Sequence, residues 1–204
     1  ESSGGDVVAI TCCPARAGKM LTDAAAVGAD TLMHVQIDGQ DSIDSTQIQS
    51  VLVAALEKAG CEVVFCGKQA ADTNGGSTGP GVAMLMGASC VSHVSEVSAD
   101  AGGYTALRAS SGGAERVHVS APCVFAFDKG LEELRRPNVR GIMMAKKKVI
   151  ETVSPEDLGV SMGESRVTVI SHSPPPEKPP GQKFEGADSV ATVVSKLRDE
   201  ANVI

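Results

Sequence analysis

Residues 62–81 read EVVFCGKQAADTNGGSTGPG, an apolar run followed by a glycine-rich loop and the start of an apolar helix. The run at 62–66 has the length and composition of a buried parallel strand. Where such a strand passes through a loop into a helix, backbone N–H groups and the helix dipole favour an anion. The spacing matches neither G-x-x-x-x-G-K-[ST] nor G-x-G-x-x-G, so magnesium-dependent NTP hydrolysis is unsupported. Two interpretations follow: a nucleotide- or phosphate-binding loop, or a structural surface loop.

The polar side chains of this loop are compatible with both interpretations. Ser77 and Thr78 offer hydroxyl donors, while Lys68 either balances phosphate charge or is simply solvated. Asp72 either bonds its own backbone in a turn or fixes the loop as a structural carboxylate. Glycine lets a chain approach a phosphate closely because it has no side chain. The glycines with this role would be Gly75, Gly76, Gly79 and Gly81.

Upstream of this stretch, strands and helices alternate. Apolar runs at 6–11 and 31–35 predict two further buried strands. An Ala-rich segment at 15–27 and apolar residues at helical spacing over 45–59 predict two helices. This alternation indicates right-handed crossovers and a parallel sheet, the mark of an α/β fold.

Downstream, the pattern becomes β-rich. A short apolar helix is predicted over about 80–87, and Gly-Gly pairs beyond it are typical of hairpin turns. The predicted β-rich pieces lie at 90–97, 104–108, 115–120 and 122–127. We therefore expect one α/β domain over residues 1–163.

The remaining residues, 164–204, are expected to form a separate arm. Five prolines within 174–180 predict an extended spacer, and apolar residues at helical spacing over 187–199 predict an amphipathic helix. A lone helix of this length is marginal in water. It should therefore dock, either on its own domain or on a partner subunit.

Composition excludes several classes of protein. The 204 residues carry a net charge of −7, which argues against general nucleic-acid binding. Aromatic residues make up 2%, too few for a stacking surface for single-stranded nucleic acid. No apolar run is long enough for a membrane helix.

Catalytic and metal-binding patterns are not evident. The six cysteines include no C-x-x-C pair and are expected to be buried free thiols in a reducing compartment. Cys12 ends the first predicted strand, where ligands of open parallel sheets bind, but no base stands near it to activate its thiol. The four histidines show no metal spacing, and no Ser-His-Asp pattern emerges.

A basic stretch, 135–148, carries six lysines and arginines and no acid. It is either a solvated basic loop or a docking site for an acidic partner. Apolar residues lie among the charges, an arrangement that suits protein docking better than DNA binding. They are Val139, Ile142, Met143 and Met144.

Several motifs together resemble the β subunit of electron transfer flavoprotein, most closely the mitochondrial and proteobacterial type. The resemblance extends from the first residue to the last. The matching stretches are 12–15, 28–30, 67–72, 77–79, Arg108 with 112–115, 142–148, 156–160 and the Pro-rich tail with its final helix.

This resemblance implies a parallel-sheet, Rossmann-like domain that binds adenine nucleotide, with a β-rich extension and a C-terminal arm docking on a partner. It implies a heterodimer with an α subunit, carrying one FAD held mainly by α and one AMP in this subunit. Electrons would arrive from acyl-CoA dehydrogenases and leave to a membrane quinone oxidoreductase, with no catalytic residue in this chain. The compartment would be the mitochondrial matrix or the bacterial cytoplasm.

By position, the resemblance also assigns site residues. Cys12 matches an AMP contact, and Arg108 matches an arginine near the flavin and the subunit interface. The AMP-binding loop would comprise Gly67, Lys68, Gln69, Ala70, Ala71, Asp72, Thr73, Asn74, Gly75, Gly76, Ser77 and Thr78. The loop that recognises partner dehydrogenases would comprise Arg135, Arg136, Val139, Arg140, Ile142, Met143, Lys146 and Lys147.

Some positions depart from the family pattern. Val139 replaces an anchoring leucine, and Ala109 replaces an acid that pairs with the preceding arginine in some members. The opening segment of the family pattern, with its first strand and further AMP contacts, is also missing, so we expect this chain not to be stable alone. Two alternatives remain: a bifurcating relative that holds a second FAD instead of AMP, and a non-redox nucleotide-binding α/β protein.

Overall fold

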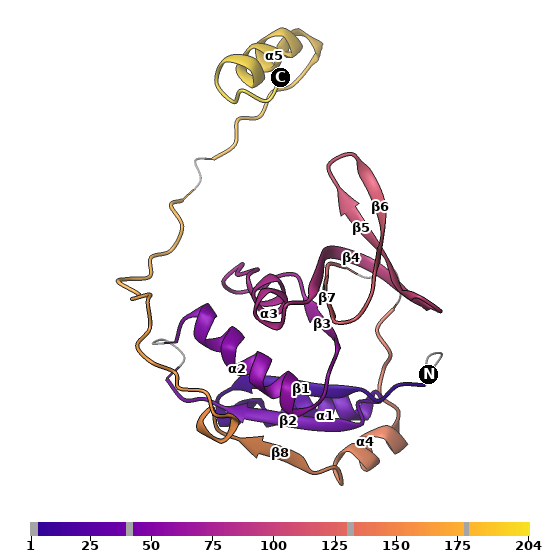
Figure 1. The fold of residues 1–204 in the computed structure, drawn as a ribbon. Helices are drawn as coiled ribbons and strands as arrows, with labels where there is room; N and C mark the ends of the chain where they lie inside the picture. The colour runs from indigo at the N-terminus through magenta and orange to yellow at the C-terminus, as the bar shows by residue number, and fades with distance from the viewer. Residues whose placement is uncertain (1–3, 40–42, 130–132, 178–179) are drawn as a thin grey trace. The chain divides into compact units, whose positions relative to one another are not determined.

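A computed structural model describes residues 4–39, 43–129, 133–177 and 180–204. The chain divides into two compact units, Glu1–Val169 and Ile170–Ile204. The strands, all in the first unit, are β1 (Val8–Cys13), β2 (Thr31–Gln36), β3 (Val63–Gly67), β4 (Ser89–Asp100), β5 (Gly103–Ser110), β6 (Gly113–Val119), β7 (Cys123–Phe127) and β8 (Ile150–Val153) (Figure 1). Its α-helices are α1 (Gly18–Ala26), α2 (Ser45–Lys58), α3 (Thr78–Met86) and α4 (Val139–Ala145). Short 3₁₀ turns lie at Ala15–Ala17 and Glu156–Leu158.

The first sheet has the order β1-β2-β8, and both of its strand pairs are parallel. Side chains of β2 alternate between its two faces. Leu32 packs with Leu21 of α1 and Ala145 of α4, whereas Met33 packs with Val51 of α2. Helices α1 and α4 therefore cover one face of this sheet, and α2 covers the other.

The second sheet has the order β3-β7-β4-β5-β6. Strands β3, β7 and β4 are parallel, and β5 and β6 continue the sheet as antiparallel hairpins. Val124 of β7 packs with Val82 of α3 and Leu56 of α2, while its neighbours Cys123 and Phe125 pack with Val91 of β4 on the opposite face.

Helix α2 supplies buried side chains to the cores of both sheets. Val51 and Ala55 belong to the core around β2, and Val53 and Leu56 belong to the core around β7. The Asp44 carboxylate accepts a hydrogen bond from the Gln47 amide, and the Gln47 side chain accepts one from the Asp44 amide. This capping box satisfies amides at the start of the helix that its own turns leave unpaired.

The α/β class and the predicted elements up to Val119 are confirmed. The predicted assignment of the third strand to the same sheet as the first two differs from the structure, because β3 pairs with β7. Apolar composition predicts that a strand is buried, but it does not identify the strand beside it. The predicted β-rich run at 122–127 forms β7, a parallel strand between β3 and β4. Helix α4 and strand β8 were not predicted.

The second unit contains a 3₁₀ turn at Ala187–Ser189 and the helix α5 (Val190–Asp199), in the predicted segment. Its apolar residues Val190, Val194 and Leu197 are exposed. Across the described parts of both units, no helix combines the length and the apolar character needed to cross a membrane.

Replacing Gly141 of α4 with alanine is expected to lower the free energy of unfolding by about 1–3 kcal/mol. A Cβ at this position would lie 2.5 Å from the backbone oxygen of Ala26, so α4 would have to move away from α1. Helix propensity alone would favour alanine by about 1 kcal/mol, so packing decides the sign. Thermal or denaturant unfolding measures the effect.

Gly18→Ala in α1 is the matched control, because a Cβ there meets no atom within 4 Å. It should raise the free energy of unfolding by up to about 1 kcal/mol. Equal stabilities of the two variants would contradict the packing argument.

Candidate functional site

The loop predicted to bind an anion runs from the carboxyl end of β3 to the start of α3, and most of it is exposed. Its own hydrogen bonds hold it in shape. The Ala70 amide donates to the Gly75 carbonyl oxygen (2.9 Å), and the Asn74 amide donates to the Ala70 carbonyl oxygen (3.0 Å). The Asp72 carboxylate accepts from the Thr73 amide (2.8 Å), so Asp72 bonds the local backbone as a turn residue does.

Four consecutive amides at the start of α3 remain open. Within the described residues, no hydrogen bond is donated by the amides of Gly76, Ser77, Thr78 and Gly79. The Ser77 side chain, at the N-cap position, makes no capping bond. An uncapped helix start with open amides carries partial positive charge and can bind an anion such as a phosphate.

The glycines of the loop have roles other than the predicted one. A Cβ on Gly79 would lie 2.8 Å from Cys66 Sγ, and a Cβ on Gly81 would lie 2.2 Å from the Gln49 side chain. Both glycines lie inside α3, where they allow it to pack closely on β3 and α2. The close approach of a phosphate to these two positions remains a prediction.

Lys68 forms an ion pair with a residue outside the loop, and its predicted role in balancing phosphate charge remains a prediction. Its Nζ lies 2.7 Å from Oδ2 of Asp128, which follows β7, and this bond is the main reason that the pKa of the Asp128 carboxyl is lowered. His93, at a bulge in β4, has its Nδ1 3.9 Å from the same oxygen. The lysine thus belongs to a small cluster at the carboxyl ends of three parallel strands.

Cys12 lies at the end of β1, half-buried against the core around α2. The pKa of its thiol is raised to about 12. Burial is the main cause, and the neighbouring Cys13 contributes less. The thiol therefore stays protonated near neutral pH. No hydrogen bond connects Cys12 to the loop in the described part of the chain, so their predicted association in one site remains a prediction.

Arg108 lies in β5 directly opposite Glu115 of β6. Its Nε is 3.9 Å from a Glu115 carboxylate oxygen, yet this buried nitrogen has no hydrogen-bond partner among the described residues. Glu115 thus supplies Arg108 with the negative charge that an acid at position 109 provides in some family members and that Ala109 lacks. An orphaned buried donor is uncommon in folded proteins and therefore calls for an explanation.

The basic stretch forms α4 and its flanks. Asn138 caps this helix by accepting from the Gly141 amide (2.7 Å). Val139 is 76% exposed and Met143 is 61% exposed, so apolar side chains face outward. Lys148 does not contribute to this surface, because its Nζ donates to the carbonyl oxygens of Ala29 (2.6 Å) and Asp30 (2.9 Å).

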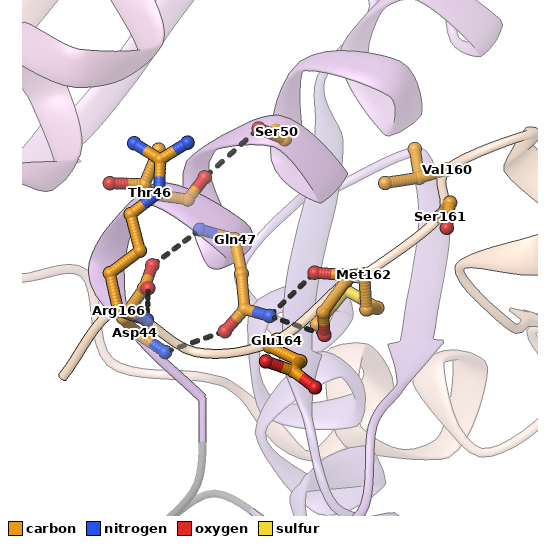
Figure 2. Close-up of a pocket in the computed structure, with 10 residues that line it drawn as sticks. Asp44, Thr46, Gln47, Ser50, Val160, Ser161, Met162, Glu164 and Arg166 are labelled. Atoms are coloured by element: carbon orange, nitrogen blue, oxygen red, sulfur yellow. Dashed lines mark hydrogen bonds between the residues drawn. The ribbon is translucent and has the colours of Figure 1, made fainter. Parts of the chain in front are cut away.

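A hollow of about 350 Å³ lies elsewhere, at the start of α2 (Figure 2). There the Gln47 side chain donates to the Met162 and Gly163 carbonyl oxygens, and the Asp44 carboxylate accepts from the Arg166 amide (2.8 Å). These bonds attach residues 162–166 to α2. No residue of the loop at 67–78 lines this hollow.

Two residues that contribute to these sites were missed from the sequence, Gln49 and Asp128, and the bonds of Lys148 to Ala29 and Asp30 were also not predicted. Gln49 could have been found, since it shares a helical stripe with the apolar Val53 and Leu56 and a polar residue there needs a partner. The partners of Asp128 and Lys148 are distant in sequence and follow only from the topology. No metal-binding group of three or more His, Cys, Asp or Glu side chains occurs in the described ranges.

Alkylation by iodoacetamide at pH 8 should modify Cys12 at least about tenfold more slowly than Cys90, since only the thiolate reacts. The Cys12 thiol is half-buried with a pKa of about 12, whereas Cys90 is exposed and burial raises the pKa of its thiol less, with Arg108 acting against the rise. Peptide mapping by mass spectrometry measures both rates, with the urea-unfolded protein as control. Equal rates in the folded protein would contradict the burial of Cys12.

The comparisons with known proteins give one family. The family model for the electron transfer flavoprotein domain matches residues 1–158. The chain is 33% identical over 200 residues to electron transfer flavoprotein subunit beta of Mus musculus, covering 97% of this chain and 77% of that protein. It is 32% identical to the human protein of the same name, covering 95% and 75%, and 30% identical to that of Bacillus subtilis, covering 100% and 81%. The chain therefore belongs to the β subunits of the electron transfer flavoprotein family.

Proposed function

We propose that this chain binds AMP at the loop 67–78 and pairs with an α subunit that holds most of the FAD. The heterodimer would carry electrons from acyl-CoA dehydrogenases to a membrane quinone oxidoreductase. One observation carries the AMP proposal: the open amides of Gly76, Ser77, Thr78 and Gly79 at the uncapped start of α3. Family membership supports the electron-carrier proposal.

The loop fits a phosphate by its donors rather than by a free cation. Lys68 is paired with Asp128, so the negative charge would be met by backbone amides and the helix dipole. The Ser77 hydroxyl accepts from Gln49 and keeps its own proton for donation. Cys12 would contribute as a neutral thiol. AMP held in this way would stabilise the folded chain, since it binds the folded loop and not an unfolded one.

Arg108 is the residue of this chain proposed to act at the flavin and subunit interface. The FAD supplies the redox chemistry when bound. The buried Arg108 Nε has no hydrogen-bond partner in the described structure, which supports an external acceptor at this position. The half-exposed arginine would donate a hydrogen bond across the interface and orient its acceptor.

The segment 135–148 is proposed to dock acyl-CoA dehydrogenases. Exposed apolar residues ringed by cations have the composition of a binding centre with a charged rim. Arg136, Arg140, Lys146 and Lys147 would guide an acidic partner to Val139 and its apolar neighbours. The proposal suits the mitochondrial matrix or the bacterial cytoplasm, since curated relatives come from mammals and bacteria.

Thr78→Asp is expected to weaken AMP binding at least tenfold, because about 1.4 kcal/mol of repulsion between the carboxylate and the phosphate gives this factor. The same carboxylate should raise the stability of the ligand-free protein by about 0.3–1 kcal/mol, since acids favour a helix start. Titration calorimetry and thermal unfolding of the protein purified with its partner subunit measure these opposite effects.

Thr192→Asp makes the same change in the exposed first turn of α5 and should leave AMP affinity unaltered. If Thr78→Asp binds AMP as tightly as the wild type, the phosphate does not lie at the start of α3. If the wild type binds no AMP, the cofactor proposal fails.

Val139→Asp is expected to raise the KM for this flavoprotein in flavin reduction by an acyl-CoA dehydrogenase about tenfold, the usual effect of losing an anchor at an interface. The free energy of unfolding should change by less than about 0.5 kcal/mol, since the side chain is exposed. Val167→Asp, at a 62% exposed valine outside 135–148, is the control. Equal KM values for the two variants would count against docking through α4.

A further inference from the structure

Gln49 is a buried amide on the face of α2 that is otherwise apolar. It is 8% exposed and is one of three buried polar or charged residues in the described chain, with His34 and Asp44. Burying an amide costs free energy unless hydrogen bonds replace those to water. Both bonds that its Nε2 donates go to Ser77, one to the carbonyl oxygen (3.0 Å) and one to Oγ (3.3 Å).

The sequence makes room for this contact at Gly81. A Cβ on that residue would lie 2.2 Å from Cδ and Oε1 of Gln49 and 2.5 Å from its Nε2. Only glycine therefore allows the Gln49 amide to pass α3 and reach Ser77. The Gly81 amide itself donates to the same Ser77 carbonyl oxygen (2.9 Å), as the first hydrogen bond of α3.

These bonds fix the direction of two donors. The carbonyl of Ser77 and the N–H of Thr78 belong to one planar trans peptide and point in opposite directions. With the carbonyl oxygen held by Gln49 and Gly81, the Thr78 N–H must point away from them, towards the open end of the helix. The Ser77 hydroxyl has one proton, and since its oxygen accepts from Gln49, that proton is left to donate elsewhere.

We propose that Gln49 is a positioning residue for the anion site, which orients the Ser77 hydroxyl and the Thr78 amide towards the phosphate group of the nucleotide. The proposal rests on AMP binding at the loop 67–78, and it adds to that site a residue from another helix. Preorganised donors bind more tightly because they lose less freedom when the ligand arrives. The effect of Gln49 is therefore confined to the phosphate and does not extend to the adenosine part.

Gln49→Met tests this effect. The variant keeps the size of the side chain and its helix propensity, and it removes the donor. The dissociation constant of AMP should rise about tenfold, while that of adenosine should stay within about twofold. Titration calorimetry with both ligands on the protein purified with its partner subunit gives the two ratios.

Gln47→Met is the matched control, two residues earlier on α2. The Gln47 side chain also donates to backbone carbonyl oxygens, but these belong to Met162 and Gly163 rather than to Ser77. This variant should lower the melting temperature and leave the AMP dissociation constant unchanged. A general loss of stability is thereby separated from the loss of phosphate positioning.

The outcomes separate the two proposals. If the wild type does not bind AMP, the proposed function fails. If the wild type binds AMP and Gln49→Met binds it equally well, or loses AMP and adenosine to the same extent, the positioning role is overturned.

Should Gln49→Met fail to fold, Gln49→Glu provides the same test through pH. A buried glutamate has a raised pKa, and its protonated form can donate to the Ser77 carbonyl oxygen. The ratio of its AMP dissociation constant to that of the wild type should fall by about tenfold between pH 8 and pH 5. A ratio that does not change with pH overturns the proposal.

Discussion

The hydrogen bonds from Gln49 to Ser77 connect α2 to the start of α3, at the place where the ligand is proposed to bind. Helix α2 packs on the core of the first sheet with Val51 and on the core of the second with Val53. Its buried amide has to meet an acceptor in that interface. The carbonyl oxygen and hydroxyl of Ser77 are the acceptors. The bonds thereby hold the start of α3 against α2.

The glycine-rich loop meets two separate requirements, close packing of α3 and open backbone amides, which the sequence alone does not distinguish. Gly79 and Gly81 are required by packing, since side chains there would strike Cys66 and Gln49. The proposed anion binding depends on amides that donate no hydrogen bond to any described residue. A helix that starts so close to two neighbours carries no capping bond from its N-cap Ser77, and its amides remain available to a ligand.

Much of the fold followed from the sequence, because strand and helix periodicities are local properties. The loop after β3 is also a local feature, and its sequence predicts an anion site. Sheet order was not available, since β7 enters between β3 and β4 from a distant part of the chain. The partners of Lys68 and Lys148 depend on that order, and each proved to be bound within the fold.

The surface around α4 illustrates the same limit. Its charges and apolar residues were evident from the sequence, but a helix of seven residues interrupted by Gly141 gives almost no periodic signal. The structure shows why the glycine is there: α4 lies against the Ala26 carbonyl oxygen. Asn138 caps the start of α4 and Lys148 bonds the residues before β2, and the exposed valine and methionines lie between these two contacts.

The central claim is that the phosphate of AMP binds the open amides at the start of α3. Amide-resolved ¹H–¹⁵N NMR of the isotopically labelled chain in its complex tests this claim directly, with adenosine as reference ligand. The phosphate should shift the signals of Gly76, Ser77, Thr78 and Gly79, while Ala70 and Asn74, whose amides are already bonded, should change little. Binding of AMP that shifts other amides and leaves these four unchanged would contradict the account.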